Sequence, residues 1–129
     1  MILFLSEEFI CALHRDQIDL YGGAHGVRDS KILDSALNMP KAQYGGEFLH
    51  PSIFHMAAAY GFHISEGQPF FDGNKRTAGM AMLTFLELNG FEVVATSNDY
   101  YDAIMSVANQ QMNKEDLASW LKKSVIQRQ

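Results

Sequence analysis

Cysteine and proline are scarce in this sequence, and apolar runs long enough to cross a membrane are missing. A single cysteine, Cys11, cannot form an internal disulfide, and this usage fits a reducing cytoplasm. The apolar stretch from Met1 to Leu5 is only five residues long and is followed by Glu7 and Glu8. We therefore expect a cytoplasmic protein with neither a signal peptide nor a membrane span.

Basic residues are also too scattered to form a stripe. The net charge is −5, and the positive residues near the carboxyl end are interpreted as a solvated face (Lys114, Lys122, Lys123 and Arg128). Direct nucleic-acid binding is therefore disfavoured. Hydrophobic residues make up 47% of the chain and charged ones 19%, which is typical of a globular protein. The length predicts one domain, residues 1–129.

Helix start and stop signals divide the chain into six predicted helices. Their caps or first residues are Ser6, Asp29, Pro51, Asn74, Ser97 and Asn113. The first helix is expected to run to about Leu20 and to turn Leu20 inward. Asp116 completes a capping box with Asn113 at the start of the last helix, in which Val125 is expected to face the core.

Two short stretches do not have a helical pattern. The residues around the paired glycines (Gln43, Tyr44, Gly45, Gly46, Glu47 and Phe48) predict a small hairpin or flap. Residues 91–95 form a short extended run. The sequence thus predicts an all-α protein, a compact helical bundle with at most one hairpin.

The two most apolar helices, around residues 53–64 and 78–88, lack a polar face and are expected to be central. The loop that joins them is polar: Gln68-Pro69-Phe70-Phe71-Asp72-Gly73-Asn74-Lys75-Arg76. It opens a helix, and helix amino ends attract anions through unpaired N–H groups and partial positive charge. Together with Lys75 and Arg76, this helix end predicts a phosphate site. The alternative is an ordinary solvated turn between two helices.

The loop resembles the Fic/Doc motif, H-[PxI]-F-x-[DN]-[AG]-N-[KG]-R, in the death-on-curing (Doc) version with Lys after Asn. Further matching segments lie throughout the chain: Tyr21-Gly22-Gly23, Gly26-Val27-Arg28-Asp29, Leu33-Asp34-Ser35-Ala36-Leu37, Tyr44-Gly45-Gly46, His50-Pro51, Phe85-Leu86-Glu87-Leu88-Asn89-Gly90 and Leu117-Ala118-Ser119-Trp120-Leu121. The resemblance implies a compact Fic/Doc-type helical fold, in agreement with the pattern of predicted helices.

The chain departs from the motif at its first position, where Gln68 replaces the family's His. The resemblance implies that this His is the general base, and a glutamine amide cannot accept a proton. Losing a general base costs about 10²–10⁴-fold in rate. We therefore expect catalysis to be impaired. Two origins of Gln68 fit the sequence, a natural degenerate member of the family or a change introduced to allow production of a toxic protein.

The resemblance also implies roles for the rest of the motif. Phe70 would anchor the loop, and Asp72 would hold Mg²⁺, although it could be only a helix cap. Gly73, Asn74 and Lys75 would bind the phosphates of ATP. Arg76 would bind phosphate or pair with Asp72. The hairpin of Tyr44, Gly45, Gly46, Glu47 and Phe48 would pair with a target segment as an added strand, or is an ordinary surface hairpin.

The activity implied is that of a Doc toxin, which transfers the γ-phosphate of ATP to a threonine of elongation factor Tu and arrests translation. Two alternatives remain: an AMP transferase, as Fic proteins are, and a non-catalytic member that binds nucleotide or antitoxin. Gly79 stands where AMP-transferring Fic enzymes usually carry a second arginine, which favours the kinase. The expected partner is a small antitoxin whose carboxyl-terminal segment folds on binding.

Overall fold

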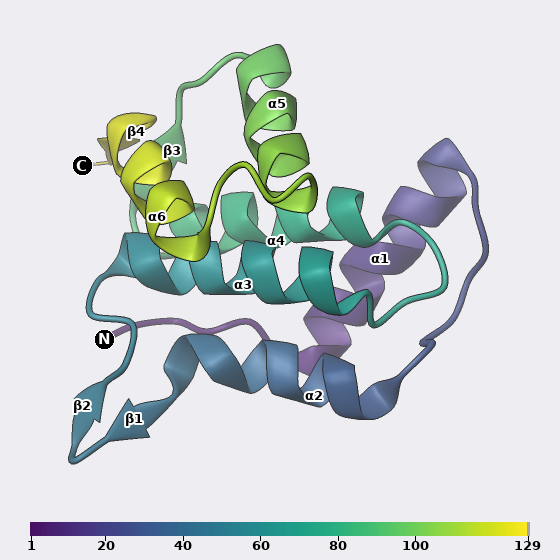
Figure 1. Ribbon diagram of the computed structural model, residues 1–129, viewed down its shortest axis with the longest axis horizontal. Helices are drawn as coiled ribbons and strands as arrows, with labels where there is room; N and C mark the ends of the chain where they lie inside the picture. The colour runs from purple at the N-terminus through teal and green to yellow at the C-terminus, as the bar shows by residue number, and fades with distance from the viewer. Residues whose placement is uncertain (129) are drawn as a thin grey trace.

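The computed structural model describes residues 1–128 and shows a helical bundle built around two antiparallel central helices (Figure 1). These are α3 (Ile53–Gly67) and α4 (Asn74–Leu88), which make the most extensive helix contact. Around them pack α1 (Glu7–Tyr21), α2 (Ser30–Asn38), α5 (Ser97–Ala108) and α6 (Lys114–Lys123). The predicted all-α fold class is confirmed, and so is the central place of the two apolar helices.

Side-chain caps fix where most of these helices begin. Ser6, Asp29, Ser52, Thr96 and Asn113 each accept a hydrogen bond from a backbone N–H in the first turn that follows. The expected capping box of Asn113 and Asp116 is present. Among the α-helices that the structure describes, α4 alone begins without a side-chain cap, because its N-cap is Gly73. The amino end of α4 therefore keeps its polar N–H groups available.

Short strands complete the chain in two separate antiparallel pairs. β1 (Gln43–Tyr44) and β2 (Glu47–Phe48) form the predicted hairpin, which follows a 3-10 turn at Met39–Lys41. Gly45 and Gly46 both have positive φ, as a type I′ turn requires. The second pair, β3 (Phe91–Val93) with β4 (Val125–Gln127), exceeds the single hairpin expected from the sequence.

Three details of the helix predictions are wrong. Pro51 precedes α3 and does not lie in its first turn, because Ser52 is the N-cap. Val125 packs against the core as expected, but it lies in β4, because α6 ends at Lys123. The hydroxyl of the C-cap Ser124 donates to the Trp120 carbonyl (2.8 Å), and the Ser124 carbonyl accepts from the Val94 N–H (2.8 Å). Leu20 is 70% exposed, because the buried face of α1 runs through Ile10, His14, Gln17 and Ile18 and does not include position 20. None of the described helices is both long enough and apolar enough to cross a bilayer.

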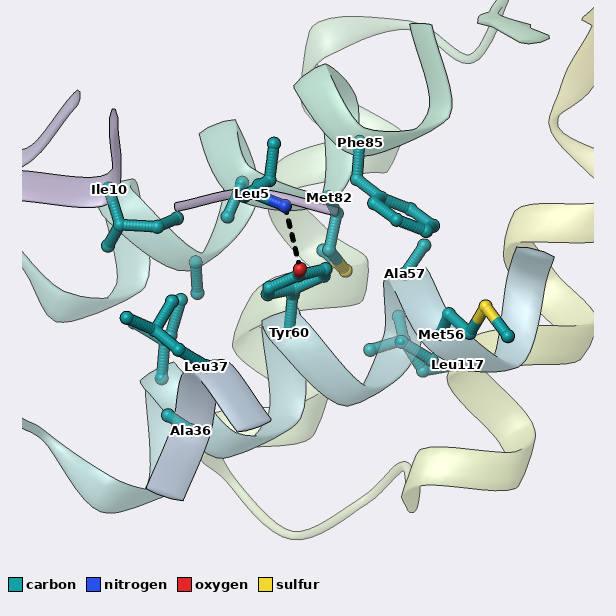
Figure 2. Close-up of a cluster of buried hydrophobic side chains, with 14 of the residues drawn as sticks. Leu5, Ile10, Ala36, Leu37, Met56, Ala57, Tyr60, Met82, Phe85 and Leu117 are labelled. Carbon is teal, nitrogen blue, oxygen red and sulfur yellow. Dashed lines mark hydrogen bonds between the residues drawn. The ribbon is translucent and has the colours of Figure 1, made fainter. Parts of the chain in front are cut away.

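The core is centred on Tyr60 of α3 and Phe85 of α4, both fully buried, with ring centroids 5.2 Å apart (Figure 2). The Tyr60 hydroxyl accepts a hydrogen bond from the Leu5 N–H at 2.9 Å. Asn89 holds the same amino-terminal segment through both main-chain groups of Leu3. These bonds hold the first residues of the chain against α3 and α4. Burial raises the pKa of Tyr60 to about 12, so the hydroxyl remains neutral.

Replacing Tyr60 with Phe should leave the buried N–H of Leu5 without a partner. We expect the free energy of unfolding to fall by about 1–3 kcal/mol, the usual cost of an unsatisfied buried donor. Urea unfolding followed by circular dichroism measures this. The matched control is Tyr44→Phe on the exposed hairpin, which should change stability by less than about 0.5 kcal/mol. Equal unfolding midpoints for the two variants would contradict the assignment.

His63 links α3 to α6, because its Nε2 accepts a hydrogen bond from the Lys114 ammonium at 3.1 Å. Burial, and then the charge of Lys114, lower the pKa of His63 from its ordinary value of 6.5 to about 4. The unfolded chain therefore binds this proton first as the pH falls. Neutral, buried His63 therefore makes its full contribution to stability above the unfolded pKa, and this contribution is lost as the pH falls from about 6.5 to about 4.

The variant His63→Gln retains an acceptor for Lys114 but does not titrate. We expect its stability to fall less steeply than that of the unmodified protein when the pH drops from about 7 to about 5. Thermal unfolding across this range measures the slope. Parallel curves for the two proteins would show that His63 does not carry the dependence.

Candidate functional site

Two left-handed residues bracket the motif loop. Gln68 ends α3 with φ 51° and ψ 57°, and Gly73 precedes α4 with φ 75° and ψ 18°. A side chain at Gly73 would be strained by this φ, and its Cβ would lie 3.0 Å from Ile18 Cδ1. The chain thus reverses direction within a few residues and directs the uncapped end of α4 toward the surface.

The Asn74 side chain closes the loop from inside. Its Oδ1 accepts from the Phe70 N–H (3.0 Å), and its Nδ2 donates to the Phe70 carbonyl (2.9 Å). Because both ends of this amide are engaged with the loop, the main-chain N–H of Asn74 is the group better placed to meet a phosphate. The phosphate-binding role of Asn74 stays a prediction. The structure adds a second role, in which the Asn74 side chain stabilises the motif loop.

Phe70 and His14 hold the loop from beneath. Phe70 is 1% exposed and stacks on the His14 ring, with centroids 3.9 Å apart. His14 Nε2 lies 2.8 Å from the Asp72 carbonyl, which can only accept, so this nitrogen carries the proton. Burial lowers the pKa of His14, which favours its neutral form. No pattern in the sequence predicted a role for His14, which lies 58 positions before Asp72.

The segment between α1 and α2, residues 22–29, covers the outer side of the loop. The Ala24 N–H donates to Asp72 Oδ2 at 2.7 Å, and the Phe71 N–H donates to the Gly26 carbonyl. Arg28 donates from Nε to the Gln68 carbonyl (2.7 Å) and from Nη2 to the Gly67 carbonyl (2.9 Å). Arg28 therefore holds the backbone of position 68 in place. Arg28 lies in one of the segments that resemble the family, but no role was predicted for it from the sequence.

A cavity of about 540 Å³ opens beside the amino end of α4. The motif supplies most of its lining (Gln68, Phe71, Asp72, Gly73, Asn74, Lys75 and Arg76), and α3 and α5 supply the rest (Ser65, Tyr101, Ile104 and Met105). Lys75 is exposed, and Asp72 is the one carboxylate in the lining. Ser65, missed by the sequence reasoning, is 5% exposed, and its hydroxyl has no partner among the described residues. The cavity thus offers donors and one carboxylate to an anionic ligand.

Arg76 does not pair with Asp72, although this was one of the two roles considered from the sequence. Its guanidinium donates to the Gln17 carbonyl (3.1 Å) and the Gly22 carbonyl (2.9 Å) and lies over the Tyr21 ring. These carbonyls belong to the carboxyl end of α1, where a cation is favoured. Arg76 thus ties α4 to α1 while it borders the cavity.

The hairpin is not brought to the cavity. β1 and β2 lie near the amino end of α3, and the motif loop lies at its carboxyl end (Figure 1). α3 has 15 residues and spans roughly 22 Å at 1.5 Å per residue. None of Tyr44, Gly45, Gly46, Glu47 and Phe48 lines the cavity. The hairpin therefore does not border the cavity, and its pairing with a target segment stays a prediction.

Gly79 is buried in the contact between α4 and α5. The Tyr100 hydroxyl donates to the Gly79 carbonyl at 2.6 Å, and a Cβ added at Gly79 would lie 2.6 Å from Ile104 Cδ1. A side chain at this position would have to displace the end of the Ile104 side chain. The packing between α4 and α5 therefore disfavours a second arginine at position 79.

The chain belongs to the Fic/DOC family, whose model matches residues 4–86, more than half of the sequence. It is 39% identical over 75 residues to Toxin Doc of Mycolicibacterium smegmatis, and the aligned part covers 58% of each chain. The chain thus spans less than two thirds of that relative's length. It is also 29% identical over 119 residues to Protein kinase doc of Escherichia phage P1, an alignment that covers 92% of this chain and 93% of the relative.

Replacing Arg28 with Ala should loosen position 68 without unfolding the bundle, because Arg28 is exposed and touches the loop backbone. A hydrogen bond from a charged donor contributes about 1.5–3 kcal/mol at most, and exposure reduces this. We expect hydrogen exchange at the amides of Gln68 and Phe70 to accelerate by roughly tenfold, because 1.4 kcal/mol corresponds to a factor of ten. Arg15→Ala on the exposed face of α1 is the control. If the hydrogen-exchange rates of both amides were unchanged, Arg28 would not be the residue that holds the backbone of position 68.

Proposed function

We propose that this protein is a Doc-like toxin whose motif loop binds the triphosphate of ATP. The observation that carries the proposal is the uncapped amino end of α4, which meets Lys75, Asp72 and the side chain of position 68 in one cavity. N–H groups and an ammonium bind phosphate oxygens, and the carboxylate can share a cation with them. A transferable phosphoryl group needs this kind of positioning and charge neutralisation more than covalent help.

Asp72 fits the requirements of Mg²⁺. Mg²⁺ usually binds through one or two carboxylates, keeps several waters and takes its remaining ligands from phosphates. Asp72 is exposed in the cavity and uses one oxygen, Oδ2, to accept from the Ala24 N–H. No cluster of three or more His, Cys, Asp or Glu side chains suited to a metal occurs in residues 1–128. When bound, the metal would neutralise phosphate charge beside Asp72.

Position 68 would face the hydroxyl that receives the phosphoryl group, and here it is Gln68. An amide can orient this hydroxyl but cannot accept its proton. No histidine lines the cavity in the described part of the chain. His14 is buried beneath the loop and bound to the Asp72 carbonyl, and His63 contacts Lys114. We therefore infer that this chain binds nucleotide and transfers phosphate poorly.

The acceptor we propose is a threonine of elongation factor Tu, so that transfer arrests translation in the cytoplasm. A small antitoxin is the proposed regulatory partner. The support is the similarity to Toxin Doc and Protein kinase doc together with the family motif. Gln68 also favours a second candidate, a non-catalytic member that still binds nucleotide or antitoxin. The buried Gly79 disfavours the AMP transferase.

Restoring the base by Gln68→His should raise transfer of the γ-phosphate to elongation factor Tu by about 10²–10⁴-fold. Purified protein is incubated with the factor, Mg²⁺ and ATP labelled at either the α- or the γ-phosphorus. We expect label only from the γ position.

The controls are Gln68→Ala and the double variant Gln68→His with Asp72→Asn, neither of which should transfer. Label from the α position would identify an AMP transferase. Nucleotide binding with no transfer from either label would favour the non-catalytic candidate.

A further inference from the structure

The cavity beside α4 contains two uncharged polar side chains that phosphate binding does not use. Ser65 and Gln68 both come from the carboxyl end of α3 and line this cavity. The motif loop and the first turn of α4 supply Asp72 and Lys75 to the same lining. The cavity therefore combines charged groups that suit phosphate and its cation with two neutral hydrogen-bonding groups close by in the chain.

Ser65 carries a buried hydroxyl without a hydrogen-bond partner among the described residues. The residue is 5% exposed. A serine within a helix often donates to the carbonyl four residues before it, which here is Gly61, but Ser65 does not make this bond. An unpaired buried hydroxyl is destabilising, so its presence calls for an explanation. At the wall of a cavity, the explanation we favour is a small polar molecule held there during the reaction.

Gln68 is fixed through its main chain, and its side chain is not part of these contacts. Its N–H donates to the Ile64 carbonyl (3.1 Å), and its carbonyl accepts from Arg28 Nε (2.7 Å). The residue is exposed at the cavity. Its amide offers one acceptor, Oε1, and two N–H donors on Nε2. This side chain can therefore accept from a nucleophile and donate to a phosphate oxygen at the same time.

Two neutral acceptors in one cavity suit water better than a protein hydroxyl. A water molecule has two hydrogens, one for Gln68 Oε1 and one for Ser65 Oγ, and it keeps a lone pair for phosphorus. A threonine hydroxyl has only one hydrogen to give. Glutamine orients the attacking water in this way in GTP-hydrolysing proteins. Phosphoryl transfer depends mainly on positioning and charge neutralisation, so an oriented water can react slowly without a general base.

We propose that this chain hydrolyses ATP slowly, with Gln68 and Ser65 orienting the attacking water, an inference that rests on the proposed function. The water oxygen forms a bond to the γ-phosphorus. The bond from this phosphorus to the bridging oxygen breaks, and ADP leaves with the electron pair. One water proton stays on the new phosphate, and the other passes through a phosphate oxygen to solvent. Gln68 thus changes the acceptor from a protein to water.

The test measures phosphate release from ATP with Mg²⁺ by the unmodified protein, Gln68→Ala and Ser65→Ala. We expect each variant to lower kcat by roughly tenfold, which corresponds to about 1.4 kcal/mol of transition-state stabilisation. KM should change by less than about twofold, because neither side chain is assigned to nucleotide binding. In water enriched in heavy oxygen, the label should enter the released phosphate and not ADP.

The controls separate chemistry from folding and from contaminating enzymes. Ser119→Ala, on the exposed face of α6, should keep the unmodified rate. Ser65→Ala removes a hydroxyl that has no partner, so its thermal stability should not fall. Asp72→Asn is purified in parallel, and we expect it to release no phosphate, so any release that it shows measures contamination.

Equal kcat values for the unmodified protein, Gln68→Ala and Ser65→Ala would overturn the inference. Heavy oxygen in AMP or pyrophosphate would also overturn it, because water would then attack a different phosphorus. If the unmodified protein binds ATP and Gln68→His modifies elongation factor Tu, but the unmodified protein releases no phosphate, hydrolysis alone is refuted. If the unmodified protein does not bind ATP, the proposed function fails as well.

Discussion

The reciprocal hydrogen bonds between the Asn74 side chain and the main chain of Phe70 are the constraint on which the site depends. They close the motif loop on itself and leave Phe70 stacked on His14, which in turn holds the Asp72 carbonyl. With the loop fixed in this way, α4 needs no side-chain cap, and its amino end opens into the cavity. An uncapped helix end is tolerated here because the surrounding contacts, rather than a cap, hold the helix start in place.

Much of the fold follows from local signals in the sequence. The caps at Ser6, Asp29 and Asn113 act within one turn, and the apolar character of α3 and α4 requires burial on every side. The mistakes lie at the ends of elements, where tertiary contacts decide. Leu20 is apolar but lies outside the buried face of α1. The residues that precede Val125 have a helical pattern, yet the hydrogen bonds of Ser124 end the helix and start a strand.

The site was predictable only where it is continuous in sequence. Gln68, Asp72, Gly73, Lys75 and Arg76 belong to one loop, and the structure places all of them around one cavity. The contributions of His14, Ser65 and Arg28 come from outside the loop. The bonds of His14 and Arg28 to the loop, and the place of Ser65 in the cavity wall, depend on how the helices pack. The position of the hairpin was not predictable for the same reason, because its pattern predicts a turn but does not say at which end of α3 it lies. Asn74 shows a further limit of prediction from sequence. Its polar side chain, expected to contact a ligand, instead forms hydrogen bonds with its own loop.

The left-handed backbone of Gln68 has a consequence for how activity and folding are related in this chain. A residue other than glycine costs of order 1 kcal/mol in that conformation, and this cost comes from the backbone and Cβ that glutamine and histidine share. The Arg28 bonds that stabilise it reach main-chain carbonyls and do not depend on which side chain is present. Replacement of glutamine by histidine at this position is therefore expected to be nearly neutral for folding. Under the proposed function, one codon would then decide activity while the backbone of the loop stays the same.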